Sequence, residues 1–280
     1  VHYHNSYFVG FLMDGILLLE KQKETDHYQI QSLPINSGVF CLKKDRFQDV
    51  VWIGTDGQGV YLYSNPLYSI KSMVLSNYTE KIERPVRAIY LDDECTFWVG
   101  TKGNGILKIY DYEFDKNISD CRAEVLTTSN SALSSNAVYC FAKSHRNLLW
   151  IGDEEGLTYY SYREKRIKSI PIRIGNEDFK YIHDIYETAD SELWLASVGM
   201  GVVKARIAGT PDNPVIVDAQ RYIINDGELG SNYFFTIYAE NEANLLFGNK
   251  GYGVFRYNET TNGLEPVSTH KYENMTLNNI

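Results

Sequence analysis

The chain has 280 residues, of which 22% are charged, and its formal net charge at pH 7 is −9. This acidic balance argues against a nucleic-acid surface, which would need a clustered basic face. No apolar stretch is long enough to cross a bilayer; Ile16 to Leu19, for example, spans only four residues. The four cysteines include no CxxC pair, so neither a zinc site nor a redox motif is indicated.

A short motif recurs six times along the chain. An apolar pair, usually beginning with Trp, ends in glycine, and a polar turn then leads to a second glycine and another apolar run. The six copies start at Phe8, Trp52, Trp98, Trp150, Trp194 and Leu246. The residue at the first-glycine position recurs after 44, 46, 52, 44 and 52 residues. A period in this range, built from short strands and Gly turns, is typical of a β-propeller.

Each motif predicts the middle of a four-stranded blade. An apolar run precedes it and forms the expected inner strand; these runs start at Val39, Val86, Val138, Ile182 and Phe235. The Trp strand, a Gly turn and a third strand follow, and a more polar fourth strand is expected near 69–74 or 166–170. Four short strands with tight connections form one blade. No segment keeps a 3.6-residue apolar period, so the sequence predicts an all-β chain of four-stranded antiparallel blades with little helix.

The predicted blades cover almost the whole chain. Their limits are 1–34 (partial), 35–82, 83–131, 132–177, 178–228 and 229–275, and 276–280 resembles the start of another blade. The first blade is expected to lack its inner strand, because the chain opens directly before a Trp-position strand. We therefore expect a fragment of a longer protein, and a complete propeller or propeller array with seven or more blades.

Most of the repeated residues have a structural interpretation. Gly in the turns supplies positive φ at little steric cost. The tryptophans are expected to pack blade against blade. Cys41 and Cys140 fall at equivalent inner-strand positions and are predicted to be buried thiols between blades.

Little in the sequence indicates catalysis. His183 lies beside Asp184 on an inner strand, where a structural role is favoured over a catalytic one. The acidic turn 153–155 could hold a hard cation, but a solvated hairpin tip is the favoured interpretation. No nucleophile lies next to a recognisable base, so no catalytic residue, metal ion or cofactor is predicted.

The candidate binding face contains the Trp-strand hairpins and the loops that precede the inner strands, here named lead-in loops. In a propeller these segments share one end of each blade, and pockets form where loops converge. The predicted ligand-binding residues are Arg84, Lys102, Asn136, Tyr181, Tyr233 and Tyr252. Aromatic rings mixed with amides and cations suit carbohydrate-like or anionic ligands. The turns at the opposite end, such as 43–46 and 92–94, are expected to be solvated.

The repeat resembles that of the two-component regulator propeller family. The pattern Leu-Trp-Ile-Gly, a short turn and Gly-Leu/Val-x-x-Tyr is clearest over 149–160 and 51–63, with Leu-Ser-x-Asn-x-Val at 133–138 before the former. Ala196 and Leu246 depart from it. Proteins with such repeats are typically periplasmic sensing halves of membrane-spanning hybrid histidine kinases in gut Bacteroidetes, and many respond to oligosaccharides released from glycans.

The resemblance implies a periplasmic ectodomain that senses an oligosaccharide or another small polar ligand. The implied partners are further domains of the same parent chain, with a homodimer allowed, and neither nucleic acid nor membrane is contacted by this segment. The resemblance brings no catalytic residues. Two alternatives stay open: a propeller lyase or hydrolase with a metal-assisted site at the channel mouth, and a protein-interaction scaffold.

Overall fold

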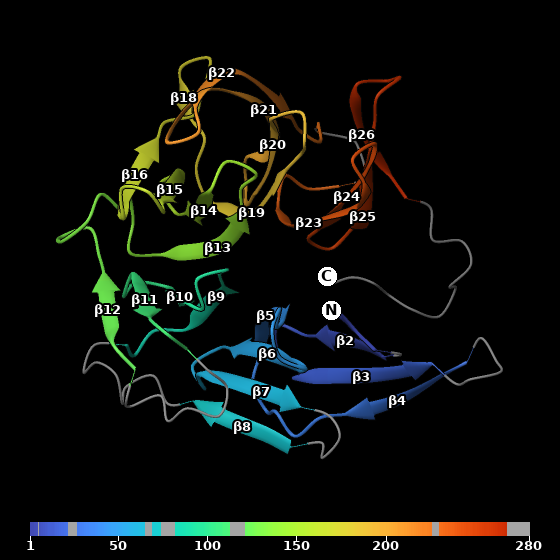
Figure 1. Cartoon of the computed structure of the whole chain (residues 1–280). Coiled ribbons are helices and arrows are strands. Elements are labelled where there is room, and N and C mark those ends of the chain that lie inside the picture. The colour runs from blue at the N-terminus through green and yellow to red at the C-terminus, as the bar shows by residue number, and fades with distance from the viewer. Residues whose placement is uncertain are drawn as a thin grey trace. The chain divides into compact units, whose positions relative to one another are not determined.

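The computed structural model describes residues 1–4, 6–21, 27–64, 69–73, 82–112, 121–225 and 230–267. These residues form strands and turns without helix: six four-stranded antiparallel sheets and one two-stranded sheet (Figure 1). The all-β fold class and the β-propeller blades predicted from the sequence are therefore confirmed. The chain divides into two compact units, Val1–Thr127 with Asn136–Val138, and Thr128–Ser135 with Tyr139–Ile280. Residues 276–280, predicted to start a further blade, lie outside the described residues.

The first unit contains three sheets whose neighbouring strands follow one another in the chain. The first sheet comprises β1 (His2–Tyr3), β2 (Ser6–Gly10), β3 (Ile16–Lys21) and β4 (Tyr28–Ser32). The second comprises β5 (Val39–Lys44), β6 (Val50–Thr55), β7 (Val60–Ser64) and β8 (Ser69–Met73). The third comprises β9 (Val86–Leu91), β10 (Phe97–Thr101), β11 (Ile106–Ile109) and β12 (Ala123–Leu126). The expectation that the first blade lacks an inner strand is wrong, because β1 pairs with β2 over two residues.

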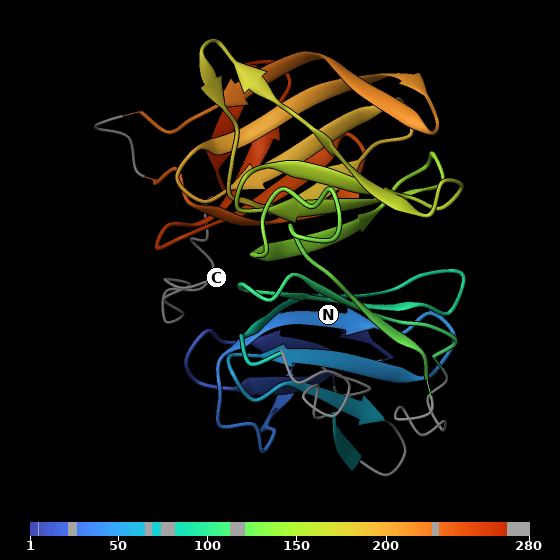
Figure 2. The same ribbon diagram turned by 90° about the vertical axis from the view of Figure 1, so that its left-hand side faces the viewer.

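The second unit contains the remaining sheets. The fourth blade comprises β13 (Val138–Lys143), which begins at the boundary between the units, β14 (Leu148–Asp153), β15 (Leu157–Ser161) and β16 (Arg166–Ile170). The fifth comprises β19 (Ile182–Glu187), β20 (Glu192–Ser197), β21 (Gly201–Thr210) and β22 (Asn213–Tyr222). The sixth comprises β23 (Phe234–Asn241), β24 (Asn244–Asn249), β25 (Gly253–Asn258) and β26 (Gly263–Pro266). A small hairpin of β17 (Arg173–Ile174) and β18 (Glu177–Asp178) lies between the fourth and fifth blades in the chain. The long β21–β22 ribbon is orange in Figure 2.

The tryptophans of the repeat pack between neighbouring blades, as predicted. Trp52 lies against Phe97 and Tyr112 of the third blade, with ring centroids 4.6 and 5.3 Å away. Trp194 likewise contacts Phe247 and Tyr257 of the sixth. Both tryptophan rings are almost completely buried. The apolar faces of the second and fifth sheets are thus covered by the next blade of the same unit.

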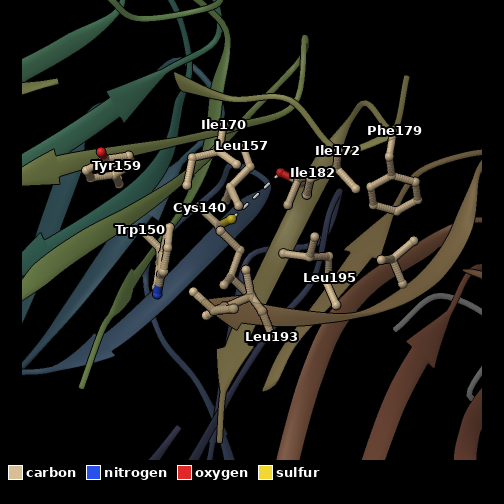
Figure 3. Packing of buried hydrophobic residues seen from close by; sticks show 14 of the residues in the cluster. Cys140, Trp150, Leu157, Tyr159, Ile170, Ile172, Phe179, Ile182, Leu193 and Leu195 are labelled. Carbon is tan, nitrogen blue, oxygen red and sulfur yellow. Dashed lines mark hydrogen bonds between the residues drawn. The ribbon is translucent and has the colours of Figure 1, made fainter. Parts of the chain in front are cut away.

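The first glycine of the motif allows two strands to approach closely. A Cβ at Gly54 or Gly152 would lie 2.4 Å from the Sγ atom of Cys41 or Cys140, respectively. Burial raises the pKa of the Cys41 thiol to about 12. The pKa of Cys140 is also well above its ordinary value because the thiol is buried. The two thiols occupy equivalent positions, as predicted, but only Cys140 is buried and Cys41 is partly exposed. Figure 3 shows Cys140 within the apolar cluster of the second unit.

The turns between inner and Trp strands correct one expectation. Asp45 and Asp92 are only 4% and 1% exposed, although their turns were expected to be solvated. The carboxylate of Asp45 accepts a 2.8 Å hydrogen bond from the Trp52 indole, and that of Asp92 accepts one of equal length from Trp98. Each carboxylate also accepts backbone N–H groups of its own turn. These aspartates therefore brace the turn against the buried ring, while their neighbours in the turns stay exposed.

Candidate functional site

Within each unit, the Trp-strand hairpin lies against the lead-in loop of its own blade. In the first unit Lys102 N donates to Pro85 O at 2.9 Å. In the second, Val198 N donates to Tyr181 O at 3.1 Å and Lys250 N donates to Tyr233 O at 2.9 Å. The two kinds of segment therefore share one end of the blade, as the sequence predicted. We call this the hairpin end.

The structure brings Arg84, Lys102 and Asn136 together in the first unit. The side chain of Asn104 accepts the backbone N–H of Arg84 at 2.9 Å, which ties the lead-in loop to the hairpin. The Arg84 side chain passes within 3.6 Å of a Cβ placed on Gly103. Arg84 and Lys102 are exposed, and Asn136 is half-buried. Two exposed cations therefore lie beside one joint between neighbouring blades.

The three candidate tyrosines lie at the hairpin end of the second unit. Tyr181, Tyr233 and Tyr252 are 41%, 44% and 49% exposed. Val198 links the first two, because its N–H donates to Tyr181 while its backbone forms a bridge with Tyr233. The Lys250 ammonium lies 5.5 Å from the centre of the Tyr233 ring. Exposed rings beside a cation are thus presented on consecutive loops.

Asn136 and Asn232, which lie at equivalent positions of two lead-in loops, have a structural role. The Asn136 carbonyl accepts N–H groups of Gly103 and Gly105, and the Asn232 carbonyl accepts those of Gly199 and Gly201. The Asn232 side chain also bonds the backbone N–H and C=O of Ile224, at 2.7 and 3.1 Å. The Leu-x-Ser-Asn segment is therefore a joint that locks a lead-in loop to the preceding hairpin.

His183 is packed between rings of the neighbouring blades in the second unit. It stacks on Tyr139 with centroids 4.2 Å apart and meets Phe235 edge to face at 5.2 Å. Asp184 accepts hydrogen bonds from Thr236 Oγ1 and Ile237 N at 3.1 and 2.6 Å. These contacts agree with the structural role favoured for His183. Among the described residues, no group of three His, Cys, Asp or Glu side chains could hold a metal ion.

The acidic turn of the fourth blade is not a simple solvated tip. Asp153 is fully buried, and its carboxylate accepts N–H groups of Glu155 and Gly156 at 2.9 and 3.0 Å and the Thr158 hydroxyl at 3.2 Å. Burial raises the pKa of Asp153 to about 6, although these hydrogen bonds and one from the Ser134 side chain oppose the increase. Only Glu155 is exposed, and it pairs with Lys180 at 2.5 Å.

A pocket of about 270 Å³ lies next to this turn, within the second unit. Its walls come from the β14–β15 hairpin, the end of β16, the β17–β18 hairpin and the lead-in loop of the fifth blade. The lining residues are Ser134, Glu155, Gly156, Leu157, Ser169, Ile170, Pro171, Ile172, Arg173, Asp178, Phe179 and Lys180. The sequence did not indicate this pocket, because its walls include the β17–β18 hairpin, which the repeat does not predict.

Comparison with solved structures supports the fold. The chain resembles PorZ, a surface component of the type-IX secretion system of Porphyromonas gingivalis, with a TM-score of 0.63, 15% identity, and coverage of 91% of this chain and 37% of that one. It resembles the extracellular domain of BT4673 from B. thetaiotaomicron, described as a hybrid two-component system, with a TM-score of 0.56, 15% identity, and coverage of 97% and 44%. It also resembles the β-propeller domain of Cps50 (Swd1) from Myceliophteria thermophila, with a TM-score of 0.60, 11% identity, and coverage of 95% of this chain and 86% of that one. The shared property at these identities is the β-propeller fold.

Sequence comparison assigns no family. No family model matches the chain. Translation initiation factor 6 from Saccharolobus solfataricus is 29% identical over 140 residues, which are 45% of this chain and 57% of that protein. The chain thus spans little more than half of this curated relative and less than half of PorZ and of the BT4673 extracellular domain. Within the described part of the chain, no helix is long and apolar enough to span a membrane.

Proposed function

We propose that this chain is a ligand-sensing propeller region of a hybrid two-component signalling protein, on the periplasmic side of the inner membrane. It binds a glycan-derived oligosaccharide at the hairpin end and passes a conformational or dimerisation signal to a kinase module elsewhere in its parent. Further domains of the parent chain and a second copy are the expected partners of that signal.

Two independent observations support this proposal. The Leu-Trp-Ile-Gly repeat and its Leu-Ser-x-Asn lead-in resemble those of the two-component regulator propellers. The fold likeness to the extracellular domain of BT4673 extends over 97% of the chain. The binding role chiefly rests on the exposed side chains at the hairpin end of each unit: the cations in the first unit, and the tyrosines on consecutive loops in the second.

The ligand chemistry follows from these side chains. Arg84 and Lys102 are exposed cations that can pair with carboxylate or sulfate groups of a glycan. The exposed rings of Tyr181, Tyr233 and Tyr252 can stack on the apolar faces of sugar rings. The cations of the first unit suit an acidic or sulfated oligosaccharide, and the rings of the second unit suit an oligosaccharide of either kind.

Calorimetric titration of the intact sensor domain with a panel of neutral, acidic and sulfated oligosaccharides tests the proposal. Arg84→Ala and Tyr181→Ala should weaken binding of the cognate oligosaccharide by about tenfold or more, with a nearly unchanged melting temperature. The matched controls are Arg46→Ala, in a turn at the opposite end, and Tyr238→Ala, an exposed ring within β23. Full affinity in the first pair and lost affinity in the controls would show that the site is misplaced.

The two alternative functions have distinct outcomes. The fold likeness to PorZ, a component of a secretion system, is the reason to test a scaffold role. That role would be favoured if no oligosaccharide binds but a protein partner does. A lyase or hydrolase would show metal-dependent turnover of a glycan or cyclic peptide that His183→Ala abolishes. We expect no turnover, because the His183 ring stacks on Tyr139 and has a packing role.

A further inference from the structure

The pocket of the second unit has the properties of a preformed binding site. Its floor is apolar: Leu157, Ile172 and Phe179 belong to the main apolar cluster of the unit and are at most 2% exposed (Figure 3). A floor of this kind keeps its shape without a ligand, because its side chains are close-packed on the other side.

The rim of the pocket has two ion pairs. Lys180 Nζ lies 2.5 Å from Glu155 Oε2, and Arg173 Nε lies 2.9 Å from Asp178 Oδ1. All four side chains are partly exposed, so a ligand can reach them. The positive and negative charges are equal in number, and each cation already faces a carboxylate.

Backbone contacts hold the rim in place. The Lys180 carbonyl accepts the Ser197 hydroxyl at 2.6 Å, and Phe179 N donates to Ile172 O at 2.8 Å. The buried Asp153 carboxylate binds Glu155 and Gly156 through their N–H groups and Ser134 through its side chain, and all three residues line the pocket. Asp153 is therefore a positioning residue behind the wall.

We propose that this pocket binds one uncharged sugar ring through its hydroxyl groups. The inference rests on the proposed function, since the ring would be one unit of the sensed oligosaccharide. Neighbouring hydroxyls can donate to Glu155 or Asp178 and accept from Lys180 or Arg173 without altering the balance of charge. An anionic group would meet cations that are already neutralised. A volume of about 270 Å³ lies just below the range of roughly 300–1,000 Å³ for drug-sized ligands, which limits the pocket to one ring.

The test uses monosaccharide probes on the full chain, followed by backbone-amide and methyl NMR. Glucose, galactose, mannose and N-acetylglucosamine are the neutral probes, and glucuronate is the charged one. At least one neutral probe should shift the signals of Gly156, Ile170 and Lys180 in a saturable way. Lys180→Met should weaken this binding about tenfold or more.

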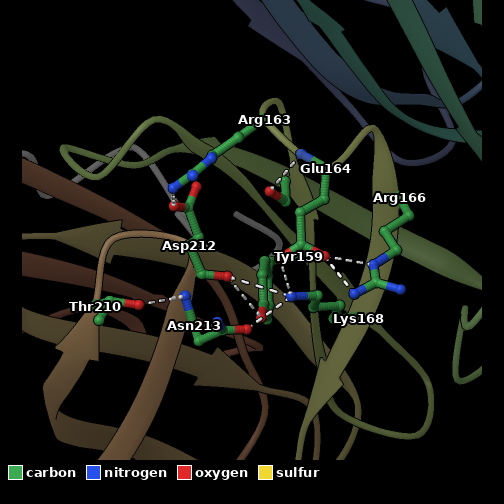
Figure 4. Close-up of polar contacts among 9 residues, drawn as sticks. Tyr159, Arg163, Glu164, Arg166, Lys168, Thr210, Asp212 and Asn213 are labelled. Atoms are coloured by element: carbon green, nitrogen blue, oxygen red, sulfur yellow. Dashed lines mark hydrogen bonds and ion pairs between the residues drawn. The ribbon is translucent and has the colours of Figure 1, made fainter.

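Two further variants test whether the monosaccharide binds inside the pocket: one fills the pocket and the other changes an ion pair outside it. Ser169→Trp fills the pocket from an exposed strand position and should abolish the shifts without touching either ion pair. Asp212→Asn is the matched control, because it breaks a comparable pair with Arg163 that lies outside the pocket (Figure 4). Saturable shifts that survive Ser169→Trp, or glucuronate binding as tightly as the neutral probes, would overturn the proposal.

The outcome is separable from that of the proposed function. If oligosaccharides bind and Tyr181→Ala weakens them while no monosaccharide shifts the pocket signals, the pocket inference is wrong and the sensing role stands. If a neutral monosaccharide fills the pocket but no oligosaccharide binds the hairpin end, the sensing proposal is the one that fails.

Discussion

The hairpins of the fourth and fifth blades both form hydrogen bonds to the next lead-in loop, but with opposite donors and acceptors. In the fifth blade, Gly199 N and Gly201 N donate to the carbonyl of Asn232 in the next lead-in loop, at 2.8 and 3.1 Å. In the fourth blade the hairpin is one residue shorter, and the direction reverses: Tyr181 N of the next loop donates to Glu154 O at 3.0 Å. The amides of this hairpin are instead satisfied by the buried Asp153 carboxylate.

This difference shows what the Leu-x-Ser-Asn joint does for the propeller. Where it is present, at Asn232 and at Asn136 of the first unit, backbone hydrogen bonds close the hairpin onto the next loop. Where it is absent, the loop 179–181 follows another path, Tyr181 adopts a φ of 55°, and the pocket opens beside it. Strained residues outside glycine are found preferentially at functional sites. The fourth-blade joint therefore differs from the other two at the place where we propose a binding pocket.

The largest expected loss of stability comes from adding a side chain at Gly201, in the hairpin of the fifth blade. Gly201 has a φ of 85°, and a Cβ there would lie 2.3 Å from the Tyr222 carbonyl oxygen. Gly201→Ala should lower the free energy of unfolding by about 4 kcal/mol, because backbone strain and a clash with backbone add. Gly199→Ala, with nothing within 4 Å, is the control and should cost about 1 kcal/mol. Equal losses in urea unfolding would show that the hairpin is not tightly packed against the end of β22.

The buried carboxylate of Asp153, in the hairpin of the fourth blade, should make the stability of the fold depend on pH. The pKa of Asp153 is about 6 in the folded chain against 3.8 for the ordinary residue, so the folded state holds this proton more tightly. The stabilisation is complete below about pH 3 and is lost as the pH rises through 6; two pKa units correspond to about 3 kcal/mol. The difference in unfolding free energy between wild type and Asp153→Asn should fall by this amount from about pH 3 to 7. Parallel curves would contradict the assignment.

The side chain of the joint asparagine should contribute a smaller amount. Asn232→Ala removes both hydrogen bonds to Ile224 and leaves the half-buried backbone groups of that residue without these partners. The expected loss is about 1–2 kcal/mol in urea unfolding. Asn176, exposed in the turn of the β17–β18 hairpin, is the control, and its change to Ala should alter stability by less than about 0.5 kcal/mol. If the loss of unfolding free energy is no larger than in the control, the backbone hydrogen bonds of Asn232 hold the joint and its side chain adds nothing.

The fold could be predicted from the sequence because its signals are local and repeated. The position of each Trp strand, the polar fourth strands β8 and β16, and the equivalence of Cys41 and Cys140 all follow from the spacing of the motif. All six candidate residues lie at the hairpin end of their units, as expected from blade topology.

The errors concern features that depend on distant partners. An aspartate in a polar turn resembles a solvated residue, and only the Trp52 indole, seven residues away across the hairpin, shows that Asp45 is buried. The pocket depends on a contact between Glu155 and Lys180, 25 residues apart, and on the β17–β18 hairpin, which lies outside the repeat. The shortened turn and the missing Leu-x-Ser-Asn before β19 were the available signals.

The smallest effect on stability should accompany a large effect on binding. Tyr181 has a φ of 55°, a conformation that Asn adopts more readily than a bulky aromatic residue. Tyr181→Asn should therefore leave the free energy of unfolding within about 0.5 kcal/mol of wild type, while removing the exposed ring from the proposed sugar-binding face. Tyr233→Asn is the matched control for stability, because Tyr233 lacks the positive φ and its ring contacts Lys250. Thermal unfolding and oligosaccharide calorimetry on both variants decide the question: a destabilised Tyr181→Asn variant with full affinity would make the ring a packing residue and the fourth-blade joint an ordinary loop.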